Sequence, residues 1–262
     1  MTDFIPENGG RKPEHSQDYD AVAALYDERV RSGQMQRQSE DPLLQEAGKR
    51  TLDLLERELY KPDKKSIRLV ELGSGRGALT RRLLASDPYF QDTSRHIDIT
   101  AVDVSGISLE EYSREVPAAR ANTKVQAIQS TIGHAVGQIE DEIDNVVSTG
   151  VAQITPPEVS EALSALLPRL VEGGAFIFQY YPPQSGERDE GVPIQTRGLG
   201  KYFSYRYPRS YLDAMIKDIA QAQGLALEVK FIDMPPVVMR NPLNLQQMMP
   251  PHRADFLVIH RK

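Results

Sequence analysis

The sequence has no cysteine, no excess of basic residues and no long apolar run. The absence of cysteine excludes disulfide bonds, thiolate zinc sites, thiolate-held iron–sulfur clusters and a cysteine nucleophile. A membrane-spanning helix needs roughly 20 consecutive apolar residues, and no run approaches that length. The N-terminal segment is polar and lacks the apolar core of a signal peptide. We therefore expect a soluble, cytoplasmic protein.

The charge balance bears on the kind of partner. The chain has 31 Lys and Arg against 37 Asp and Glu, a net charge of −6 at pH 7. Proteins that bind nucleic acid usually carry a basic field that neutralises the phosphate backbone. The sequence therefore disfavours nucleic acid as a partner. With 262 residues, 40% of them hydrophobic, the chain is long enough to bury one sizeable core.

Short β-rich runs alternate with helical patterns over most of the chain after residue 66. Strands are predicted at residues 67–71, 97–104, 124–130, 145–149, 174–181, 225–234 and 254–261. Helical patterns cover residues 78–86, 106–116, 132–143, 156–170 and 209–224. Such alternation indicates right-handed β-α-β crossovers and a mostly parallel sheet with helices on its faces.

Additional segments precede and interrupt this pattern. Residues 1–16 are rich in proline, glycine and charge without a period, and are predicted to be a flexible tail. Apolar spacing predicts two helices within residues 17–62, which would form an N-terminal helical cover. The sheet-forming domain then occupies residues 63–262. Within it, a polar and aromatic excursion at about 183–207 is a candidate lid or substrate insertion.

The segment ELGSGRG, residues 71–77, places three glycines between a strand and a helix. In an open α/β sheet, ligands bind outside the carboxyl ends of the strands, and a backbone without Cβ atoms can press against such a ligand. The pattern Gly73-x-Gly75-x-x-Ala78 also fits the fingerprint of dinucleotide-binding enzymes. The glycines alone therefore leave a nicotinamide-dependent oxidoreductase open.

Three neighbouring positions distinguish the two interpretations. Glu71 precedes the first glycine by two residues, Gly77 adds a third glycine at odd spacing, and Asp103 ends the next strand. This set resembles the class I S-adenosylmethionine-dependent methyltransferases, whose first motif reads (E/D)xGxGxG and whose second strand ends in an acid. The resemblance implies a Rossmann-like α/β fold with a seven-stranded, mostly parallel sheet and an antiparallel last strand. It also implies S-adenosylmethionine as the cofactor and S-adenosylhomocysteine as its product.

The resemblance also assigns roles to residues at the strand ends. The glycines would line the methionine and ribose portions of the cofactor, Asp103 would take the ribose hydroxyls, and Glu71 would help to order the loop and the cofactor's amino group. The implied cofactor-binding residues are Glu71, Gly73, Ser74, Gly75, Gly77, Asp103, Val104, Ser130, Thr131, Ser148 and Thr149. Candidates for the substrate site are the tyrosines of the N-terminal cover and of the region after residue 179. These are Tyr26, Tyr180, Tyr181, Tyr202 and Tyr205.

Methyl transfer from a sulfonium is an in-line displacement, for which the protein mainly aligns the reacting atoms and excludes water. A base is needed only when the acceptor must lose a proton. His134, Tyr180 and Tyr181 are candidates, although a lone histidine is more often a surface or core residue and tyrosine also suits packing at a domain edge. No metal-ligand pattern is present. The acidic run EDEID, residues 140–144, is predicted to be a solvated helix end.

The favoured function is transfer of a methyl group to an O or N atom of a small-molecule acceptor. Residues 146–181 and 231–242 also resemble the bacterial phospholipid N-methyltransferases, which would bring the protein to a membrane surface. A nicotinamide-dependent oxidoreductase and a member that binds cofactor without turnover stay open as alternatives. The acceptor, the atom methylated and the oligomeric state are not fixed by the sequence.

Overall fold

The computed structural model describes residues 18–34, 42–139, 142–151, 154–184, 187, 191–197, 203–237, 240–241, 244–248 and 253–262. The predicted tail at 1–16 and the candidate substrate residue Tyr202 lie outside the described residues. Part of the excursion at 183–207 lies outside them as well.

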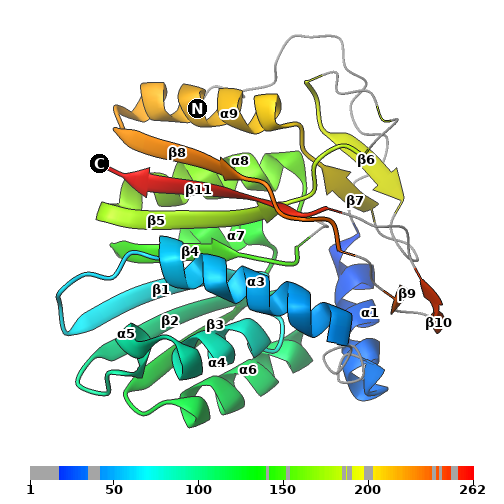
Figure 1. Ribbon diagram of the computed structural model, residues 1–262, viewed down its shortest axis with the longest axis horizontal. Coiled ribbons are helices and arrows are strands. Elements are labelled where there is room, and N and C mark those ends of the chain that lie inside the picture. Colours follow the sequence, from blue (N-terminus) through cyan, green and yellow to red (C-terminus); the bar gives the residue numbers. More distant parts are fainter. Residues whose placement is uncertain are drawn as a thin grey trace.

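Seven strands form one sheet in the order β3-β2-β1-β4-β5-β11-β8 (Figure 1). The strands are β1 (Ser66–Leu72), β2 (His96–Asp103), β3 (Thr123–Gln129), β4 (Ile143–Ser148), β5 (Leu170–Tyr180), β8 (Leu227–Ile232) and β11 (Asp255–Arg261). The first five run parallel to one another, whereas β11 is antiparallel to both β5 and β8. This confirms the predicted α/β fold with a seven-stranded, mostly parallel sheet and an antiparallel last strand.

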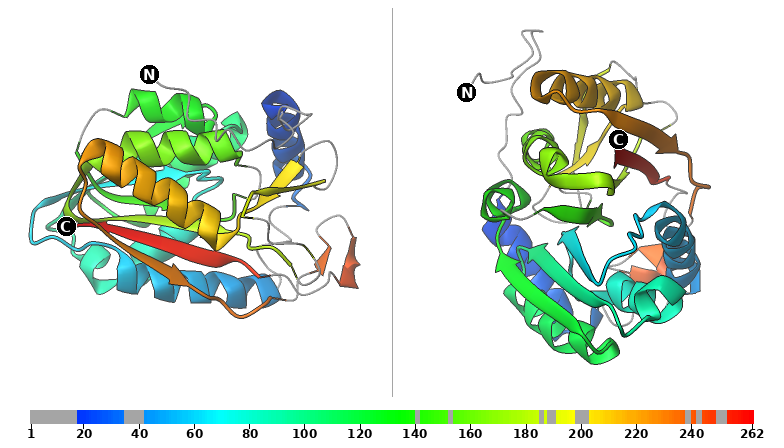
Figure 2. Two further views of the ribbon diagram at one scale, coloured as in Figure 1. Left: turned by 90° about the horizontal axis from the view of Figure 1, so that it is seen from above. Right: turned by 90° about the vertical axis from the view of Figure 1, so that its left-hand side faces the viewer.

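Helices cover both faces of the sheet (Figures 1 and 2). One face carries α3 (Pro42–Glu58), α4 (Ala78–Ser86), α5 (Pro88–Gln91) and α6 (Gly106–Ala119), and the other carries α7 (Ile132–Ala135), α8 (Pro156–Leu166) and α9 (Arg209–Gln223). Buried side chains fill the space between helices and sheet, among them Leu83 and Phe90 on the first face and Leu163 and Leu212 on the second. β4 is buried at every position, as expected for a parallel strand covered on both sides.

Local signals in the sequence explain where the helices begin and end. Thr155 and Glu158 form a reciprocal capping box at the start of α8, where prolines also occupy the first turn, and both features favour a helix N-terminus. α9 ends at Gly224, whose left-handed φ of 64° closes the helix. α4 covers the predicted residues 78–86 and begins directly after Gly77.

The chain between β3 and β4 differs from the prediction. α7 ends at Ala135 and is followed only by a 3-10 turn at Val136–Gln138, whereas a helix was expected over 132–143. Asp144, expected in a solvated helix end, is instead buried within β4. Its carboxylate accepts a hydrogen bond from the Arg68 N–H at 2.8 Å and pairs with Lys64 Nζ at 2.6 Å. That prediction is wrong because the partners lie in a distant part of the sequence.

The described part of the 183–207 excursion forms an antiparallel hairpin of β6 (Ile194–Arg197) and β7 (Phe203–Arg206). A second small sheet pairs β9 (Arg240–Asn241) with β10 (Asn244–Met248). Tyr205 and Tyr207 are buried in the core on the α8–α9 face. The Tyr207 hydroxyl donates to the Ile154 carbonyl oxygen at 2.5 Å, and its N–H donates to the Tyr181 carbonyl oxygen at 2.8 Å. These contacts fasten the end of the hairpin to the main domain.

The two N-terminal helices occupy different places. α3 packs along the face that carries α4 and buries Leu54 and Leu55 there. α1 (Tyr19–Arg31) stands instead at the edge where the parallel strands end (Figures 1 and 2), and its buried residue is Val22. Only α1 is therefore positioned over the carboxyl ends of the strands. Within the described ranges, no helix is long and apolar enough to cross a membrane.

Candidate functional site

The glycine segment between β1 and α4 forms a loop at the carboxyl edge of the sheet. The N–H groups of Gly73 and Ser74 both donate to the Val102 carbonyl oxygen of β2, at 2.8 and 2.9 Å. The Gly77 N–H donates to the Ser74 carbonyl oxygen at 3.1 Å and closes the turn. Gly73, Gly75 and Gly77 have φ values of 70°, 51° and 71°, a region that favours glycine. The residue types of the motif are therefore required by the backbone path.

The three glycines differ in what a side chain would meet. A Cβ atom at Gly73 would overlap Val151, and one at Gly77 would lie 2.7 Å from the Tyr112 ring. A Cβ atom at Gly75 would meet no described atom within 4 Å. Gly73 and Gly77 are therefore needed for packing within the protein. The space beside Gly75 is open, so a ligand can approach the backbone there.

Asp103, at the end of β2, faces this loop. Its carboxylate accepts hydrogen bonds from the N–H of Gly75 at 2.8 Å and from the N–H of Ser105 at 2.9 Å. Burial raises the pKa of Asp103, backbone hydrogen bonds lower it, and the nearby carboxylate of Asp27 adds a further increase. Neither Asp103 nor Asp27 forms an ion pair in the described part of the chain. The loop is thus bordered by negative charge that no described basic group offsets.

Glu71, the acid of the first motif, is turned toward the helices. Its carboxylate accepts hydrogen bonds from the Tyr112 hydroxyl of α6 at 2.6 Å and from the Thr80 hydroxyl of α4. Burial raises the pKa of Glu71 to about 7, although both hydrogen bonds lower it, and the charge of Asp103 adds to the increase. Glu71 joins the strand before the loop to the helices beneath it. A contact with the cofactor's amino group stays a prediction.

Some buried hydroxyls at this edge have no hydrogen-bond partner in the described part of the chain. They include those of Ser74 in the glycine loop and of Ser148 at the end of β4. A buried polar atom without a partner costs about 1–3 kcal/mol, which favours a site that takes up a polar ligand. Thr149 follows at the same edge, and the next N–H, of Gly150, donates to Gln179 Oε1 of β5 at 2.7 Å.

The candidate residues after β2 and β3 come together beside Asp103. The Ser130 N–H donates to the Asp103 carbonyl oxygen at 3.0 Å. Thr131 forms the N-cap of α7. The Val104 carbonyl oxygen accepts a hydrogen bond from Gln129 Nε2 at 3.4 Å. The structure therefore gathers the predicted cofactor-binding residues around the ends of β1, β2, β3 and β4, as the strand order requires.

α1 makes two polar contacts across this edge that the sequence analysis missed. The Ser105 hydroxyl donates to Asp27 Oδ1 at 2.6 Å, and the Tyr19 hydroxyl donates to Glu158 at the start of α8. Burial raises the pKa of Tyr19 far above its usual value, and the charge of Glu158 raises it further. α1 therefore bridges the loops after β2 and β4.

The sequence did carry a signal for these contacts, namely the repeated Tyr-Asp pair in YDAVAALYDE, residues 19–28. From this segment, Tyr26 was predicted as a substrate-site residue. Tyr26 is half-buried on α1, and the Arg29 guanidinium lies 5.4 Å from its ring centroid. The structure brings Asp27, one position further, into contact with the site.

The candidate bases do not form a catalytic constellation. His134 is exposed on α7. Tyr180 and Tyr205 are only 1% and 3% exposed and belong to the core, and Tyr181 is half-buried. Burial raises the pKa of each of these three tyrosines, so they keep their hydroxyl protons at neutral pH. They can donate hydrogen bonds, but they are poorly suited to remove a proton.

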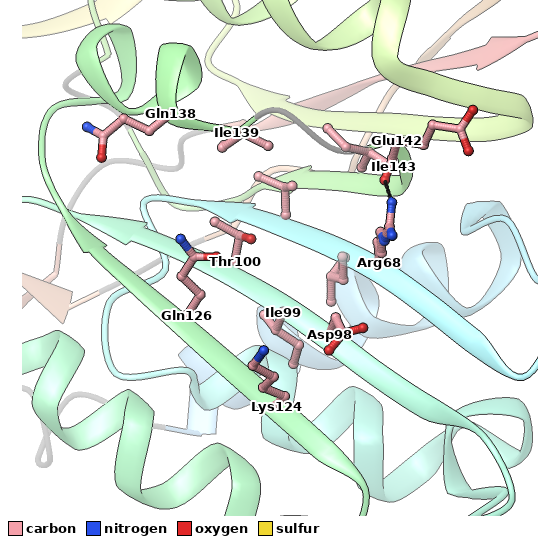
Figure 3. A pocket seen from close by; sticks show the side chains of 12 residues that line it. Arg68, Asp98, Ile99, Thr100, Lys124, Gln126, Gln138, Ile139, Glu142 and Ile143 are labelled. Carbon is pink, nitrogen blue, oxygen red and sulfur yellow. Dashed lines mark hydrogen bonds between the residues drawn. The ribbon is translucent and has the colours of Figure 1, made fainter.

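A second polar region lies on the sheet face that carries α7, at the amino half of β1, β2 and β3 (Figure 3). The short α7 leaves a hollow of about 350 Å³ there. Arg68, Asp98 and Lys124 occupy directly paired positions on adjacent strands and form a row of alternating charge. Thr100 and Gln126 form the next row. This polar hollow is distinct from the carboxyl edge and contains none of the predicted site residues.

No protein-family model matches the chain, and no curated protein matches it. Solved structures, in contrast, do match the chain. The Burkholderia thailandensis 1,6-didemethyltoxoflavin N1-methyltransferase, solved with 1,6-didemethyltoxoflavin and S-adenosylhomocysteine bound, has a TM-score of 0.53 at 13% identity, over 96% of this chain and 92% of that one. A Clostridium acetobutylicum S-adenosylmethionine-dependent methyltransferase has a TM-score of 0.51 at 13% identity, over 92% and 98% of the two chains. For a Methanosarcina mazei methyltransferase the TM-score is 0.52 at 11% identity, over 80% and 96%.

The fold is that of the class I S-adenosylmethionine-dependent methyltransferases. This agrees with the family that the glycine motif and the acid after β2 resemble. At 11–13% identity the likeness concerns the fold alone.

Proposed function

We propose that the protein is an S-adenosylmethionine-dependent methyltransferase that acts on an O or N atom of a small molecule. The observation that carries this proposal is the open space at Gly75, bordered by the Asp27 and Asp103 carboxylates without a described cation. S-adenosylmethionine has a sulfonium, an ammonium and ribose hydroxyls, all of which suit carboxylate neighbours. The similar Burkholderia enzyme contains S-adenosylhomocysteine, which supports the same cofactor here.

The same charges argue against a dinucleotide. A nicotinamide cofactor presents a pyrophosphate, which needs free N–H groups and positive charge at the start of the helix. Here the Gly75 N–H already donates to the Asp103 carboxylate. A pyrophosphate at this loop would therefore meet like charge, whereas a cationic ligand would relieve it.

The residues fit the cofactor in a consistent way. Asp103 would accept hydrogen bonds from the ribose hydroxyls, Gly75 would allow close approach, and the unpartnered hydroxyls of Ser74 and Ser148 would gain partners. When bound, the cofactor supplies an activated methyl group. The chain's own contribution is to orient that group and to exclude water from it. Since the candidate tyrosines stay protonated, an acceptor that is nucleophilic without a protein base suits this site best.

Two basic residues among those that the structure describes here, Arg206 on β7 and Arg253 before β11, are paired with carboxylates. Arg206 lies 3.4 Å from Glu187, and Arg253 Nη2 lies 2.7 Å from Asp233. Recognition of RNA or of an anionic lipid headgroup requires cations that can face phosphates. This pairing supports a small acceptor without phosphate.

The proposal is tested by calorimetric titration of the full chain with S-adenosylhomocysteine and, in parallel, with NADH. We expect micromolar binding of the first and no measurable binding of the second. Transfer of labelled methyl groups to a panel of small amines, phenols and nitrogen heterocycles is then compared with transfer to total RNA and to phospholipid vesicles. Preferential NADH binding would contradict the cofactor assignment, and preferential labelling of RNA or lipid would contradict the acceptor class.

A further inference from the structure

The helix α1 has a single fully buried side chain. Val22 is its buried residue, and an isolated helix of this length is marginal in water. Its polar contacts therefore matter for where it sits. One of these joins Tyr19 to Glu158 on α8, and another joins Asp27 to Ser105 at the start of α6. α1 consequently crosses the carboxyl edge with one attachment on each side of the glycine loop.

The second attachment continues directly into the cofactor site. The Ser105 hydroxyl donates to Asp27 Oδ1 at 2.6 Å, and the Ser105 N–H donates to Asp103 Oδ1 at 2.9 Å. Ser105 is fully buried and caps α6, because its hydroxyl oxygen accepts the Ser108 N–H at 3.1 Å. Asp27, Ser105 and Asp103 thus form one continuous hydrogen-bonded chain. Its far end is the carboxylate proposed to take the ribose hydroxyls.

We infer that Asp27 is a positioning residue for cofactor binding, acting on Asp103 through Ser105. Docked α1 fixes Ser105, and Ser105 fixes one oxygen of Asp103. Asp103 Oδ2 is fixed independently by the Gly75 N–H, so both oxygens are oriented before a ligand arrives. The inference rests on the proposed function, since it assigns a role toward the same cofactor. The inference goes beyond the proposed function because it makes α1 part of the cofactor site.

The arrangement requires that α1 and the cofactor affect each other. If docking of α1 raises the affinity for the cofactor, the cofactor must stabilise docked α1 by the same factor. Loss of the Asp27 contact should therefore weaken binding of the cofactor. It should also reduce the extent to which a bound cofactor slows hydrogen exchange of the α1 amides. If the Asp27 contact served only to hold α1 in place, its loss would not change how strongly the cofactor protects α1 from exchange.

The test compares two substitutions at Asp27 with one at Asp20. Asp27→Ala removes the carboxylate acceptor of the Ser105 hydroxyl and leaves it the Ser108 hydroxyl oxygen, 2.8 Å away. Asp27→Asn keeps a side-chain oxygen at position 27 that can accept the hydrogen bond. Asp20→Ala is the control on the same helix, because Asp20 is exposed and makes no hydrogen bond or ion pair among the described residues. Each full-length variant is titrated with S-adenosylhomocysteine in a calorimeter, and the apo proteins are melted to check their folding.

We expect Asp27→Ala to raise the Kd for S-adenosylhomocysteine about 5- to 20-fold, as the loss of one hydrogen bond to a charged group implies. Asp27→Asn should stay within about 3-fold of the wild type, and Asp20→Ala should bind like the wild type. Hydrogen exchange supplies the second readout. The ligand should slow exchange of the α1 amides in the wild type and in Asp27→Asn, but much less in Asp27→Ala.

Three outcomes overturn the inference. One is wild-type affinity in Asp27→Ala, and another is equal weakening in Asp27→Asn and Asp27→Ala, which would assign the effect to charge rather than to the hydrogen-bonded chain. The third is ligand protection of α1 that Asp27→Ala leaves intact. These outcomes all require that the wild type binds S-adenosylhomocysteine. A wild type that does not bind it overturns the proposed function itself, so the two failures are distinguishable.

Discussion

Two polar regions of the same sheet differ in how their charged side chains are arranged. At the carboxyl edge, Asp27 and Asp103 carry negative charge without a described ion pair, and the hydroxyls of Ser74 and Ser148 lack partners among the described residues. In the polar hollow at the amino half, Arg68, Asp98 and Lys124 alternate in sign on adjacent strands. In the hollow, basic and acidic side chains thus stand at paired positions of neighbouring strands, so opposite charges lie next to each other. At the carboxyl edge, the proposed cofactor would supply the missing partners.

This difference teaches that a hollow alone does not identify the site. The polar hollow exists because α7 is short and because polar residues alternate with buried ones along the three strands. An alternating strand is what a sheet face open to water requires. The carboxyl edge is distinguished instead by left-handed glycines and by N–H groups that orient a carboxylate. Variants in the two regions should therefore behave differently.

The largest effect is expected from Gly77→Ala. Its Cβ atom would lie 2.7 Å from Tyr112 and 2.7 Å from Val116, so α6 must move, and the φ of 71° adds strain. Overpacking costs about 1–3 kcal/mol and a left-handed non-glycine residue about 1–2 kcal/mol. We therefore expect the free energy of unfolding, measured in urea, to fall by about 2–5 kcal/mol. A fall no larger than that of Gly224→Ala, a remote left-handed glycine with open space around it, would contradict the packing argument.

Glu71→Gln should change how stability depends on pH. Burial raises the pKa of Glu71 from 4.5 to about 7, so between these values the folded state holds a proton that the unfolded state has lost. Stability therefore falls as pH rises through this window, by about 3 kcal/mol in total. Glutamine cannot ionise and removes this decline. The unfolding free energy of Glu71→Gln relative to wild type should thus rise between pH 4.5 and 7.5, and Glu172→Gln, at an exposed position, should show no such rise.

Gly75→Ala separates binding from stability within the glycine loop. The added methyl group meets no described atom within 4 Å, so its effect on stability should match the backbone strain of Gly224→Ala, about 1–2 kcal/mol. It projects into the space proposed for the cofactor. We expect the Kd for S-adenosylhomocysteine to rise about tenfold or more, equivalent to about 1.4 kcal/mol. Unchanged affinity in calorimetry, with Gly224→Ala as the control, would falsify the mapping of the cofactor onto this loop.

The sequence predicted the sheet and the gathering of most candidate site residues at its carboxyl edge, because both depend on local signals. Strand runs and glycines mark where each strand ends, and the carboxyl edge then collects Gly75, Asp103, Ser130 and Ser148 by topology alone. α4 was predicted to the residue because Gly77 and the apolar spacing agree.

The features that escaped prediction depend on contacts between distant residues. Ser105 and Asp27 are 78 positions apart, and the partner of buried Asp144 is Lys64. α7 ends early because the chain must turn back into β4, which a helical pattern over 132–143 does not reveal. Tyr205 lies in a polar stretch of sequence and was predicted as a substrate-site residue, yet the β6–β7 hairpin packs it into the core. Local periodicity contains none of this information.

The smallest effect is expected from Asp98→Ala, which is compared with Asp103→Ala on the same strand. Asp103 and Asp98 both lie on β2, the first at the carboxyl edge and the second in the polar hollow. Asp103→Ala should weaken S-adenosylhomocysteine binding by about 1–3 kcal/mol, because two ribose hydroxyls lose a charged acceptor.

Asp98 contacts only Ser66 at 3.3 Å and His96 at 3.1 Å among described hydrogen-bond partners, and its side chain is 38% exposed. Asp98→Ala should therefore leave the Kd unchanged and shift stability by no more than about 0.5 kcal/mol. Equal losses of affinity in the two variants would mean that the hollow and the edge act as one site, since charge in the hollow has no other route to the cofactor.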